Sequence, residues 1–383
     1  MIIEKKEGIL VAFGELFLKS ESVRKIFLQK LIQNLSFALK NKEVQFQLYP
    51  YRERIFIETK EEKKAENVIK NVFGISWFAP AIFLKGNMKE ILQFVEKNYE
   101  KWIKKNQTFA IRLKKGNLKE SSEEIIRKVA NKIKRKVNLD RPDIELFLEA
   151  RKKVWFIYFK KKRGGGGLPV GSGSKALAMI SGGIDSPVAS YLIAKRGSEN
   201  VWVHFHSFPL VSNSSIKKIK ELARVFLNYQ PKLKVYLVPF HKIQMKIKSF
   251  VEPRYRVLLY RRIMLRIAEK IAKKERCEGI VTGESLGQVS SQTLANLKII
   301  EEVTKLPILR PLIGLDKQEI IELAKEIGTY EISIKPQEDC CTLFVPKHAS
   351  AAGNIKLIRK FENKLKVEKM VRDALKEVEV VTY

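Results

Sequence analysis

Residues 181–186 of the chain, SGGIDS, combine types that could bind and cleave a polyphosphate. Two glycines let backbone N–H groups approach a phosphate closely, and the serine hydroxyls add further donors. A helix-like run begins near Pro187, so the positive end of a helix would face the same phosphate. Asp185 would be repelled by phosphate alone, and its carboxylate makes sense there if it meets the phosphates through Mg²⁺. The segment therefore predicts a pyrophosphate-binding loop, and the alternative is a tight turn in which Asp185 caps the helix.

Two other phosphate-binding motifs are excluded in the glycine-rich run at residues 160–175, KKKRGGGGLPVGSGSK. A Walker loop requires Gly-Lys-Ser/Thr, but Gly173 is followed by Ser174 and Lys175. The GxGxxG pattern fails as well, because Ala176 stands where the third glycine belongs. Since the run can neither propagate a helix nor pair well as a strand, we expect a hinge between two halves of the chain.

The elements that would position the SGGIDS loop alternate between strand and helix. Residues 186–197 and 256–274 have the 3.6-residue period of helices. Short apolar runs predict strands at residues 176–181, 201–208, 234–240 and 279–285. This alternation predicts a parallel sheet flanked by helices, which binds ligands at the carboxyl ends of its strands.

The N-terminal half predicts smaller α+β units. Strands are expected at residues 8–13, 44–49 and 54–59, with an amphipathic helix over residues 22–40. Further along, FAIRLKK at residues 109–115 alternates apolar and basic side chains, which places Arg112 and Lys114 opposite the apolar face. A capping box at Ser121 and an apolar stripe through Ile125, Val129, Ile133 and Val137 predict a basic helix that reaches Val137.

Charge points to a polyanionic partner. The chain carries 74 Lys and Arg against 42 Asp and Glu, a formal net charge of +32. Residues 101–163 alone hold 21 basic and 7 acidic side chains. A lysine-rich solvated surface, as in thermophile proteins, gains Glu along with Lys, whereas here acidic residues are far fewer than basic ones. We therefore expect a nucleic acid as the partner. The residues expected to contact RNA are Arg112, Lys114, Lys115, Arg127, Lys128, Lys132, Arg135, Lys136 and Arg141.

The cysteines and the absence of long apolar runs limit the class of protein. Cys277, Cys340 and Cys341 include no CxxC pair, so neither a disulfide framework nor a four-thiolate metal site is supported. We interpret Cys277 as a small core residue. No run approaches the roughly 20 apolar residues of a membrane span, and no signal peptide is evident, so we expect a cytoplasmic protein.

Several blocks in order resemble one family. SGGIDS matches the SGGxDS signature of the PP-loop ATP pyrophosphatases, which split ATP between its α and β phosphates. GELFLKS, FAIRLKK, HFHSFP, TGESLGQVSSQT, ILRPLIGLDKQEII and PQEDCCT are similar to blocks of the tRNA uridine 4-sulfurtransferases. The resemblance implies an α/β protein: a ferredoxin-like domain at residues 1–72, a THUMP domain at 73–165 and a parallel-sheet PP-loop domain at 174–383.

The resemblance also implies an activity. That family adenylates O4 of a tRNA uridine, expected at position 8, and then replaces the oxygen with persulfide sulfur to give 4-thiouridine. Parts of the family also supply sulfur for thiamine thiazole synthesis. Two alternatives remain: another PP-loop adenylating enzyme that acts on tRNA, and a non-catalytic RNA-binding protein.

Site residues follow from the resemblance, position by position. Lys317 would neutralise charge on the α-phosphate, and Arg310 is a second candidate for that role. The alternatives are a satisfied strand-end histidine for His204 and surface charges for Arg261 and Lys317. The implied catalytic residues are Asp185, Lys317, Cys340 and Cys341, with Mg²⁺ on Asp185; the implied ATP contacts are Met179, Ile180, Ser181, Gly182, Gly183, Asp185, Ser186, His204, Phe205, Arg261, Gly283 and Gln292.

The vicinal cysteines carry the expectation about sulfur. Some family members continue into a rhodanese domain with a persulfide cysteine, and this sequence contains no such domain. We therefore expect one of Cys340 and Cys341 to accept sulfur from an external persulfide carrier, such as a cysteine desulfurase, while the other resolves the intermediate. Which cysteine accepts stays open, and a structural pair or vicinal disulfide is the alternative. The expected partners are tRNA, that carrier and a second copy in a homodimer, with no membrane.

Overall fold

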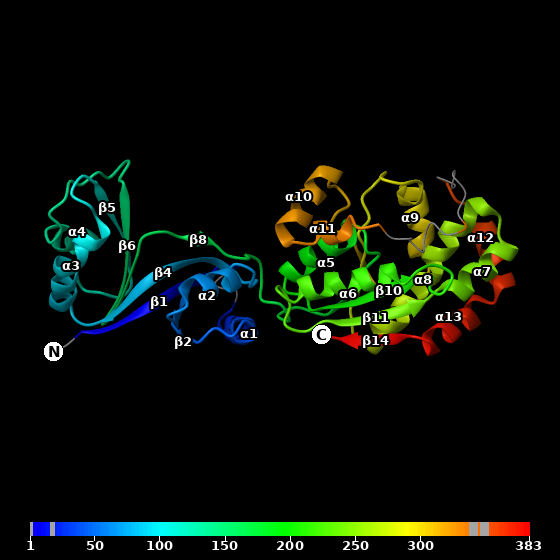
Figure 1. Cartoon of the computed structure of the whole chain (residues 1–383), viewed down its shortest axis with the longest axis horizontal. Helices are drawn as coiled ribbons and strands as arrows, with labels where there is room; N and C mark the ends of the chain where they lie inside the picture. Colours follow the sequence, from blue (N-terminus) through cyan, green and yellow to red (C-terminus); the bar gives the residue numbers. More distant parts are fainter. Residues whose placement is uncertain (1–2, 16–19, 337–343, 345–351) are drawn as a thin grey trace. The chain divides into compact units, whose positions relative to one another are not determined.

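The computed structural model describes residues 3–15, 20–336, 344 and 352–383 (Figure 1). The chain forms two compact units, Met1–Leu168 and Pro169–Tyr383, and each has its own sheet. The SGGIDS loop lies in the second unit, where it leads from the first strand into the first turn of the first helix.

The first unit is built on an eight-stranded sheet in the order β2-β3-β1-β4-β7-β6-β5, with β8 paired to β4. Only β5 and β6 are parallel among its described pairs. Its elements are β1 (Glu4–Phe13), α1 (Glu21–Asn41), β2 (Gln47–Pro50), β3 (Arg54–Glu58), α2 (Glu62–Ile69), β4 (Ile75–Lys85), α3 (Met88–Trp102), β5 (Phe109–Lys115), α4 (Ser122–Ala130), β6 (Ile144–Arg151), β7 (Val154–Tyr158) and β8 (Lys162–Arg163).

The helices of the first unit cover one face of this sheet. Val11 and Phe78 pack in the core under α1 and α2, whereas Leu84 and Ile157 pack in the core under α3 and α4. Phe78 and Leu84 are six residues apart on β4, so their side chains point to the same face. The opposite face carries an aromatic cluster that includes Phe56, Phe83, Phe147, Phe156 and Tyr158.

The basic helix ends earlier than predicted. Helix α4 stops at Ala130, and Val137, expected on its buried stripe, is 49% exposed. Beyond the helix, the chain turns to run beside β5, where Phe109 N donates to Lys136 O and Asn138 N donates to Phe109 O. A longer helix would stack like charges four residues apart, and β5 offers backbone partners instead.

The glycine-rich run packs more closely than predicted. A Cβ on Gly164 would lie 2.4 Å from Ile75 O, so only glycine allows this approach to β4. In the second unit, the N–H groups of Gly171 and Gly173 both donate to Gly197 O. The expectation that this segment pairs poorly was wrong at its start, because β8 pairs with β4.

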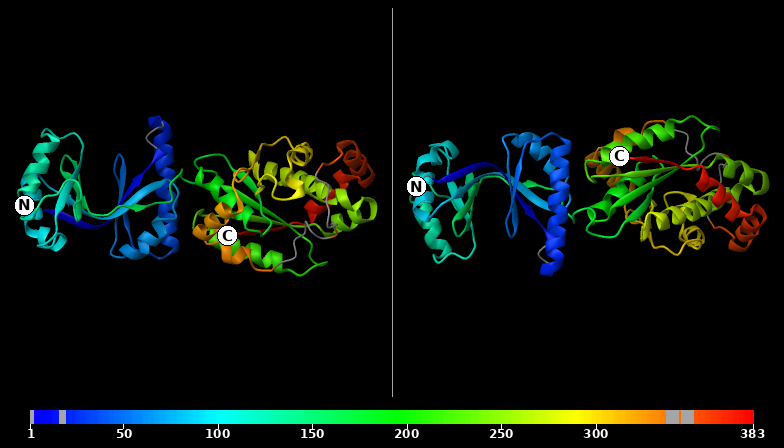
Figure 2. Two further views of the ribbon diagram at one scale, coloured as in Figure 1. Left: turned by 90° about the horizontal axis from the view of Figure 1, so that it is seen from above. Right: turned by 90° about the horizontal axis from the view of Figure 1, so that it is seen from below.

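The second unit is built on a six-stranded sheet in the order β13-β12-β9-β10-β11-β14. Figure 2 shows helices on both sides of this sheet. Its first five strands are parallel, as the alternation predicted, and β14 is antiparallel to β11. Its elements are β9 (Ala176–Met179), α5 (Asp185–Lys195), β10 (Asn200–His206), α6 (Ser214–Phe226), β11 (Lys234–Pro239), α7 (His241–Phe250), η2 (Pro253–Tyr255), α8 (Arg256–Lys274), β12 (Gly279–Val281), η3 (Ser290–Gln292), α9 (Leu294–Glu301), β13 (Ile308–Leu309), α10 (Lys317–Ile327), α11 (Tyr330–Ser333), α12 (Ile355–Leu365), α13 (Val367–Lys376) and β14 (Glu379–Thr382).

The order of the strands reverses at β9. The chain continues from β9 to β10 on one side and later returns to place β12 on the other side. Helices α5 and α6 pack against β9, β10 and β12 on one face, and α8 packs against β9 and β12 on the other. The loops after β9 and β12 therefore lie side by side at a switch point, where such sheets bind ligands.

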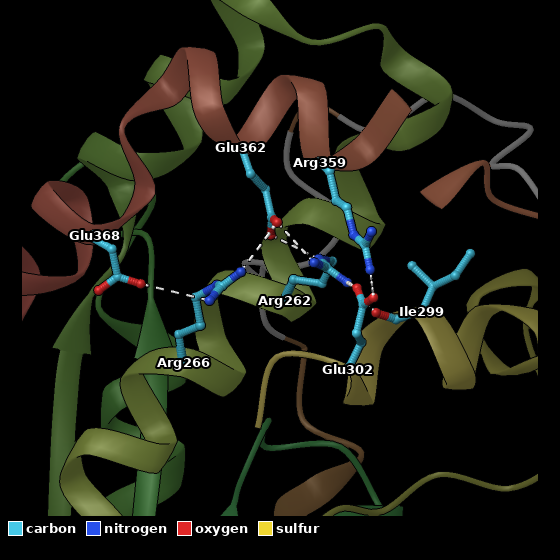
Figure 3. A network of polar contacts seen from close by, with 7 residues as sticks. All are labelled: Arg262, Arg266, Ile299, Glu302, Arg359, Glu362 and Glu368. Carbon is cyan, nitrogen blue, oxygen red and sulfur yellow. Dashed lines mark hydrogen bonds and ion pairs between the residues drawn. The ribbon is translucent and has the colours of Figure 1, made fainter. Parts of the chain in front are cut away.

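A buried ionic cluster fixes the C-terminal helices to α8 (Figure 3). Arg262 is 2% exposed, and its Nε and Nη2 each lie 2.8 Å from a carboxylate oxygen of Glu362 on α12. Its Nη1 also donates to Glu302 at 3.0 Å, after α9. Arg266 adds a second contact to Glu362 at 3.2 Å. Through these ion pairs, α8 holds α12 and the end of α9 in place.

Strand β14 closes one edge of the second sheet. It lies beside β11, and Leu233 and Tyr383 exchange backbone hydrogen bonds of 3.1 and 2.9 Å. Among the residues described, no helix is both long enough and apolar enough to cross a bilayer.

Candidate active site

The SGGIDS loop turns directly from β9 into α5. Gly182 has φ +84°, a backbone conformation that side chains other than glycine rarely adopt. Ser181 N donates to Ser186 Oγ at 3.0 Å, so a hydroxyl in the first turn of α5 holds the start of the loop. The first turn of α5 begins at Asp185, so the positive end of the helix faces the loop.

Gly283 brings the loop after β12 against this helix. A Cβ built there would lie 2.7 Å from Ser186 N and 2.8 Å from Ser186 Cα, far inside contact distance. Any other residue would push the two loops apart. The glycine that the sequence resemblance selected therefore has a local physical reason, which is the close approach of two backbones at the switch point.

Asp185 and Lys317 are brought together although they are far apart in sequence. Lys317 Nζ lies 2.5 Å from Asp185 Oδ1, and Gln288 Nε2 lies 3.4 Å from Oδ2. Lys317 is the first residue of α10, which begins at a capping box formed by Asp316 and Glu319. The carboxylate of Asp185 thus contacts Lys317 and Gln288 and does not cap α5.

A second polar cluster lies beside Gly283. Arg261 Nη1 on α8 donates to Glu284 Oε1 at 2.8 Å, and Arg310 Nε after β13 donates to Glu284 Oε2 at 2.7 Å. Glu284 is 5% exposed. Our sequence prediction included both arginines and missed the carboxylate that joins them. The sequence feature that could have revealed Glu284 is an acidic residue directly after Gly283, at the end of a short apolar strand.

Two buried polar atoms in this region have no hydrogen-bond partner within the described part of the chain. They are Oε1 of Gln292, whose residue is 8% exposed, and Nη2 of Arg310. A buried amide oxygen or guanidinium N–H is costly when unpaired, so each is a candidate contact for a ligand atom. A phosphate oxygen would satisfy Arg310, and an N–H or O–H of a nucleotide would satisfy Gln292. The residues present therefore fit ATP.

His204 and Phe205 point to opposite faces of the sheet. His204 is 2% exposed, and its Nδ1 lies 2.7 Å from Ile180 O, so Nδ1 carries the proton, because a carbonyl only accepts. Its Nε2 lies 3.3 Å from the Ser215 hydroxyl. Burial lowers the pKa of His204 to about 4, so the ring is neutral at physiological pH. Phe205 packs against Phe240 on the other face, so the two side chains do not face the same side of the sheet.

The other predicted nucleotide contacts lie at the end of β9. Met179 is half-buried and ends the strand, and Ile180 is 2% exposed. Gly183 N lies 3.4 Å from Ser181 Oγ, within the loop. Among the described residues, no three His, Cys, Asp or Glu side chains form a metal-binding group. Magnesium commonly takes one or two carboxylates plus substrate phosphates, so Asp185 fits that pattern on its own.

Cys340 and Cys341 lie outside the described residues. The chain is held on both sides of them: Lys218 Nζ donates to Ser333 O at 3.0 Å, and Arg256 Nη1 donates to Phe344 O at 2.8 Å. Cys277 is 5% exposed and packs in the core, where burial raises the pKa of its thiol to about 12. That cysteine is the core residue that the sequence predicted.

The basic residues predicted to contact RNA differ in solvent exposure and in whether they pair with a glutamate. Arg135 was predicted to face RNA, but its side chain is 9% exposed and donates to Ile103 O and Lys104 O. Lys115, Arg127, Lys136 and Arg141 are exposed. The remaining members each pair with a glutamate: Arg112 with Glu145, Lys114 with Glu53, Lys128 with Glu124 and Lys132 with Glu96.

One further basic residue of the first unit makes contacts that the sequence did not predict. Lys161 Nζ lies 4.3 Å from the ring centroid of Phe147 and 5.0 Å from that of Trp77, on the face without helices. These are cation–π contacts, and only the folded sheet brings these residues together.

A mostly parallel sheet with a glycine-rich loop at its switch point is the arrangement expected of a PP-loop nucleotide-binding domain. The family model described as Thiamine biosynthesis protein (ThiI) matches residues 171–367, and models for the ThiI ferredoxin-like domain and the THUMP domain match residues 8–79 and 85–160. The chain belongs to the ThiI family. The resemblance drawn from the sequence, and the α/β fold that it implied, are confirmed.

Relatives and solved structures agree over nearly the whole chain. A probable tRNA sulfurtransferase from Staphylococcus epidermidis is 38% identical over 98% of this chain and 94% of its own length. One from Acetivibrio thermocellus is also 38% identical, over 98% of this chain and 99% of its own length. The crystal structure of a 4-thiouridine synthetase–RNA complex with bound ATP matches with a TM-score of 0.88 at 33% identity, covering 98% of this chain and 99% of that one.

Proposed function

We propose that this protein is an ATP-dependent tRNA sulfurtransferase that converts a uridine, expected at position 8, to 4-thiouridine. The observation that carries the proposal is the ion pair between Lys317 and Asp185, the residue with which the glycine-rich loop enters α5. Arg261 and Arg310 pair with Glu284, directly after Gly283. Relatives named tRNA sulfurtransferase and the synthetase structure with RNA and ATP support the choice of substrates.

In the first step, the loop would hold ATP while the uridine is activated. Uridine O4 attacks the α-phosphorus, the bond to the bridging oxygen breaks, and pyrophosphate leaves with that electron pair. Gly182 and Gly183 would offer backbone N–H groups to the phosphates, and Lys317 and Arg310 would oppose the charge that develops. Asp185 would hold Mg²⁺, which supplies further charge neutralisation on the phosphates.

In the second step, sulfur would replace the activated oxygen. A persulfide on one of Cys340 and Cys341 attacks C4 with its terminal sulfur, and AMP leaves. The thiolate of the other cysteine attacks the resulting disulfide, which releases 4-thiouridine and leaves a disulfide between the cysteines. A cellular dithiol then reduces that disulfide. The sulfur comes from an external persulfide carrier such as a cysteine desulfurase.

The proposal divides the work between the parts of the chain. Residues 1–72 and 73–165 would bind tRNA through their exposed basic residues, and residues 174–383 would carry out adenylation. We place the protein in the cytoplasm, where tRNA and ATP are available, and expect a homodimer. A second role in thiamine thiazole synthesis belongs to the same proposal.

Pyrophosphate release from ATP, measured with and without tRNA, tests the first step. Wild type should release pyrophosphate only with tRNA, Asp185→Asn should release none, and Asp373→Asn, an exposed control, should match wild type. Release without tRNA would favour another PP-loop enzyme. No release with tRNA would favour a non-catalytic RNA-binding protein.

Mass analysis of tRNA nucleosides tests the second step. The double variant Cys340→Ala/Cys341→Ala should still release pyrophosphate but make no 4-thiouridine from a persulfide protein. Full thiolation by that variant would rule out the cysteine relay.

A further inference from the structure

Glu284 joins two arginines that come from separate elements. Its carboxylate accepts from Arg261 at 2.8 Å on one oxygen and from Arg310 at 2.7 Å on the other. Thr282 Oγ1 donates to the second oxygen at 3.0 Å. Glu284 itself lies in neither helix nor strand, directly after Gly283. One buried carboxylate therefore sets the positions of two cations at the edge of the sheet where the phosphate loop lies.

Without this carboxylate the two guanidinium groups would repel each other. Their side chains are only 22% and 15% exposed, so water screens the repulsion incompletely. Arg310 has a second partner, Glu301 at 3.0 Å, whereas Arg261 pairs with no second carboxylate among the described residues. Loss of the Glu284 charge would leave two poorly solvated cations to move apart.

A neighbouring cluster on the same helix has a different role. Arg262 follows Arg261 on α8, but its partners Glu302 and Glu362 belong to the packing of α9 and α12 (Figure 3). That cluster ties helices to one another. Glu284 directly follows Gly283, and Nη2 of Arg310 is buried without a hydrogen-bond partner among the described residues.

We propose that Glu284 is a positioning residue for ATP. It aligns Arg261 and Arg310 so that their remaining N–H groups meet the triphosphate as one unit, before ATP arrives. The inference rests on the proposed function and adds to it a residue that acts through the two arginines. Its effect should appear in the kinetics of ATP and leave tRNA affinity unchanged.

Steady-state pyrophosphate release with saturating tRNA is the main measurement. Glu284→Gln keeps the shape but removes the charge, and kcat/KM for ATP should fall on the order of 100-fold, as expected for misplaced catalytic groups. Glu284→Asp keeps the charge but reaches the two arginines less well, so its kcat/KM for ATP should be about 10-fold higher than that of Glu284→Gln. The control is Glu269→Gln on α8, a carboxylate 9% exposed that pairs with Lys273, which should retain wild-type kinetics.

A mutant cycle separates positioning from a structural role. In an Arg261→Met/Arg310→Met background, Glu284→Gln should cause less than about a 2-fold further loss, because the groups it positions are gone. An additive loss there, or wild-type kinetics in Glu284→Gln with only a lower melting temperature, would overturn the proposal. Equilibrium binding of labelled ATP gives a second readout: if wild type binds ATP but releases no pyrophosphate with tRNA, the proposed function fails while the role of Glu284 is still measured.

Discussion

Replacing Gly283 with alanine tests whether the switch point is as tight as its geometry indicates. The new Cβ would lie 2.7 Å from Ser186 N, 2.8 Å from Ser186 Cα and 2.9 Å from Asp185 C, whereas ordinary contact begins at 3.4 Å. All three atoms are backbone, so no side chain can rotate to make room. The two loops must therefore separate by about 0.7 Å.

The expected losses follow from that displacement. A shift of roughly 1 Å in a catalytic group costs on the order of 100-fold in rate, so kcat/KM for ATP should fall by some tens of fold. Overpacking should also lower the free energy of unfolding by about 1–3 kcal/mol. Pyrophosphate release with tRNA measures the first effect, and urea unfolding measures the second.

Two other glycines serve as matched controls. A Cβ on Gly314 meets nothing within 4 Å, so Gly314→Ala should retain both activity and stability. Gly287 is equally open but has φ +76°, so Gly287→Ala reports backbone strain without a collision. Wild-type kcat/KM in Gly283→Ala would refute the reasoning, because the collision is with the loop proposed to bind the phosphates.

Three further predictions concern binding, pH and stability. If tRNA is held through about five phosphates, log K against log salt should have a slope of about −4, and Lys114→Glu with Lys115→Glu should weaken binding; a slope near zero would contradict this. Because burial lowers the pKa of His204 to about 4, its contribution to stability is present above the unfolded pKa of about 6.5 and is lost as pH falls toward 4. Urea unfolding should show a loss of about 2 kcal/mol from this group between pH 7 and pH 5, and His204→Gln should lack it. Arg262→Met should cost about 3–5 kcal/mol, because it leaves Glu362 buried without its main partner; a loss below 1 kcal/mol in urea unfolding would argue against that role.

The local features of the proposed nucleotide site were readable from sequence. Glycines, serines and an aspartate between an apolar run and a helical run predicted the loop at Ser181–Ser186, because every residue involved is adjacent in the chain. The period of residues 256–274 likewise predicted α8 with its observed bounds. In both cases the signal and the structure share one short segment.

Features made by distant segments were not readable. Glu284 lies 23 residues from Arg261 and 26 from Arg310, and nothing in the spacing shows that one carboxylate reaches both. The early end of α4 has the same cause, because β5 supplies the backbone partners that draw residues 136–138 away from a helix. The burial of Arg135 against Ile103 O and Lys104 O also depends on a contact across the fold.

The pairing of β14 with β11 has a consequence for synthesis on the ribosome. The chain makes β11 first, and 140 positions separate its last residue, Pro239, from the first residue of β14, Glu379. At translation rates of about 5–20 residues per second, the edge of β11 that pairs with β14 stays unpaired for roughly 7–28 seconds. During that interval its unpaired N–H and C=O groups can pair with a neighbouring nascent chain. We therefore expect aggregation during expression to depend on how fast residues 240–379 are made, and a version of the chain lacking β14 to aggregate even when its nucleotide loop is intact.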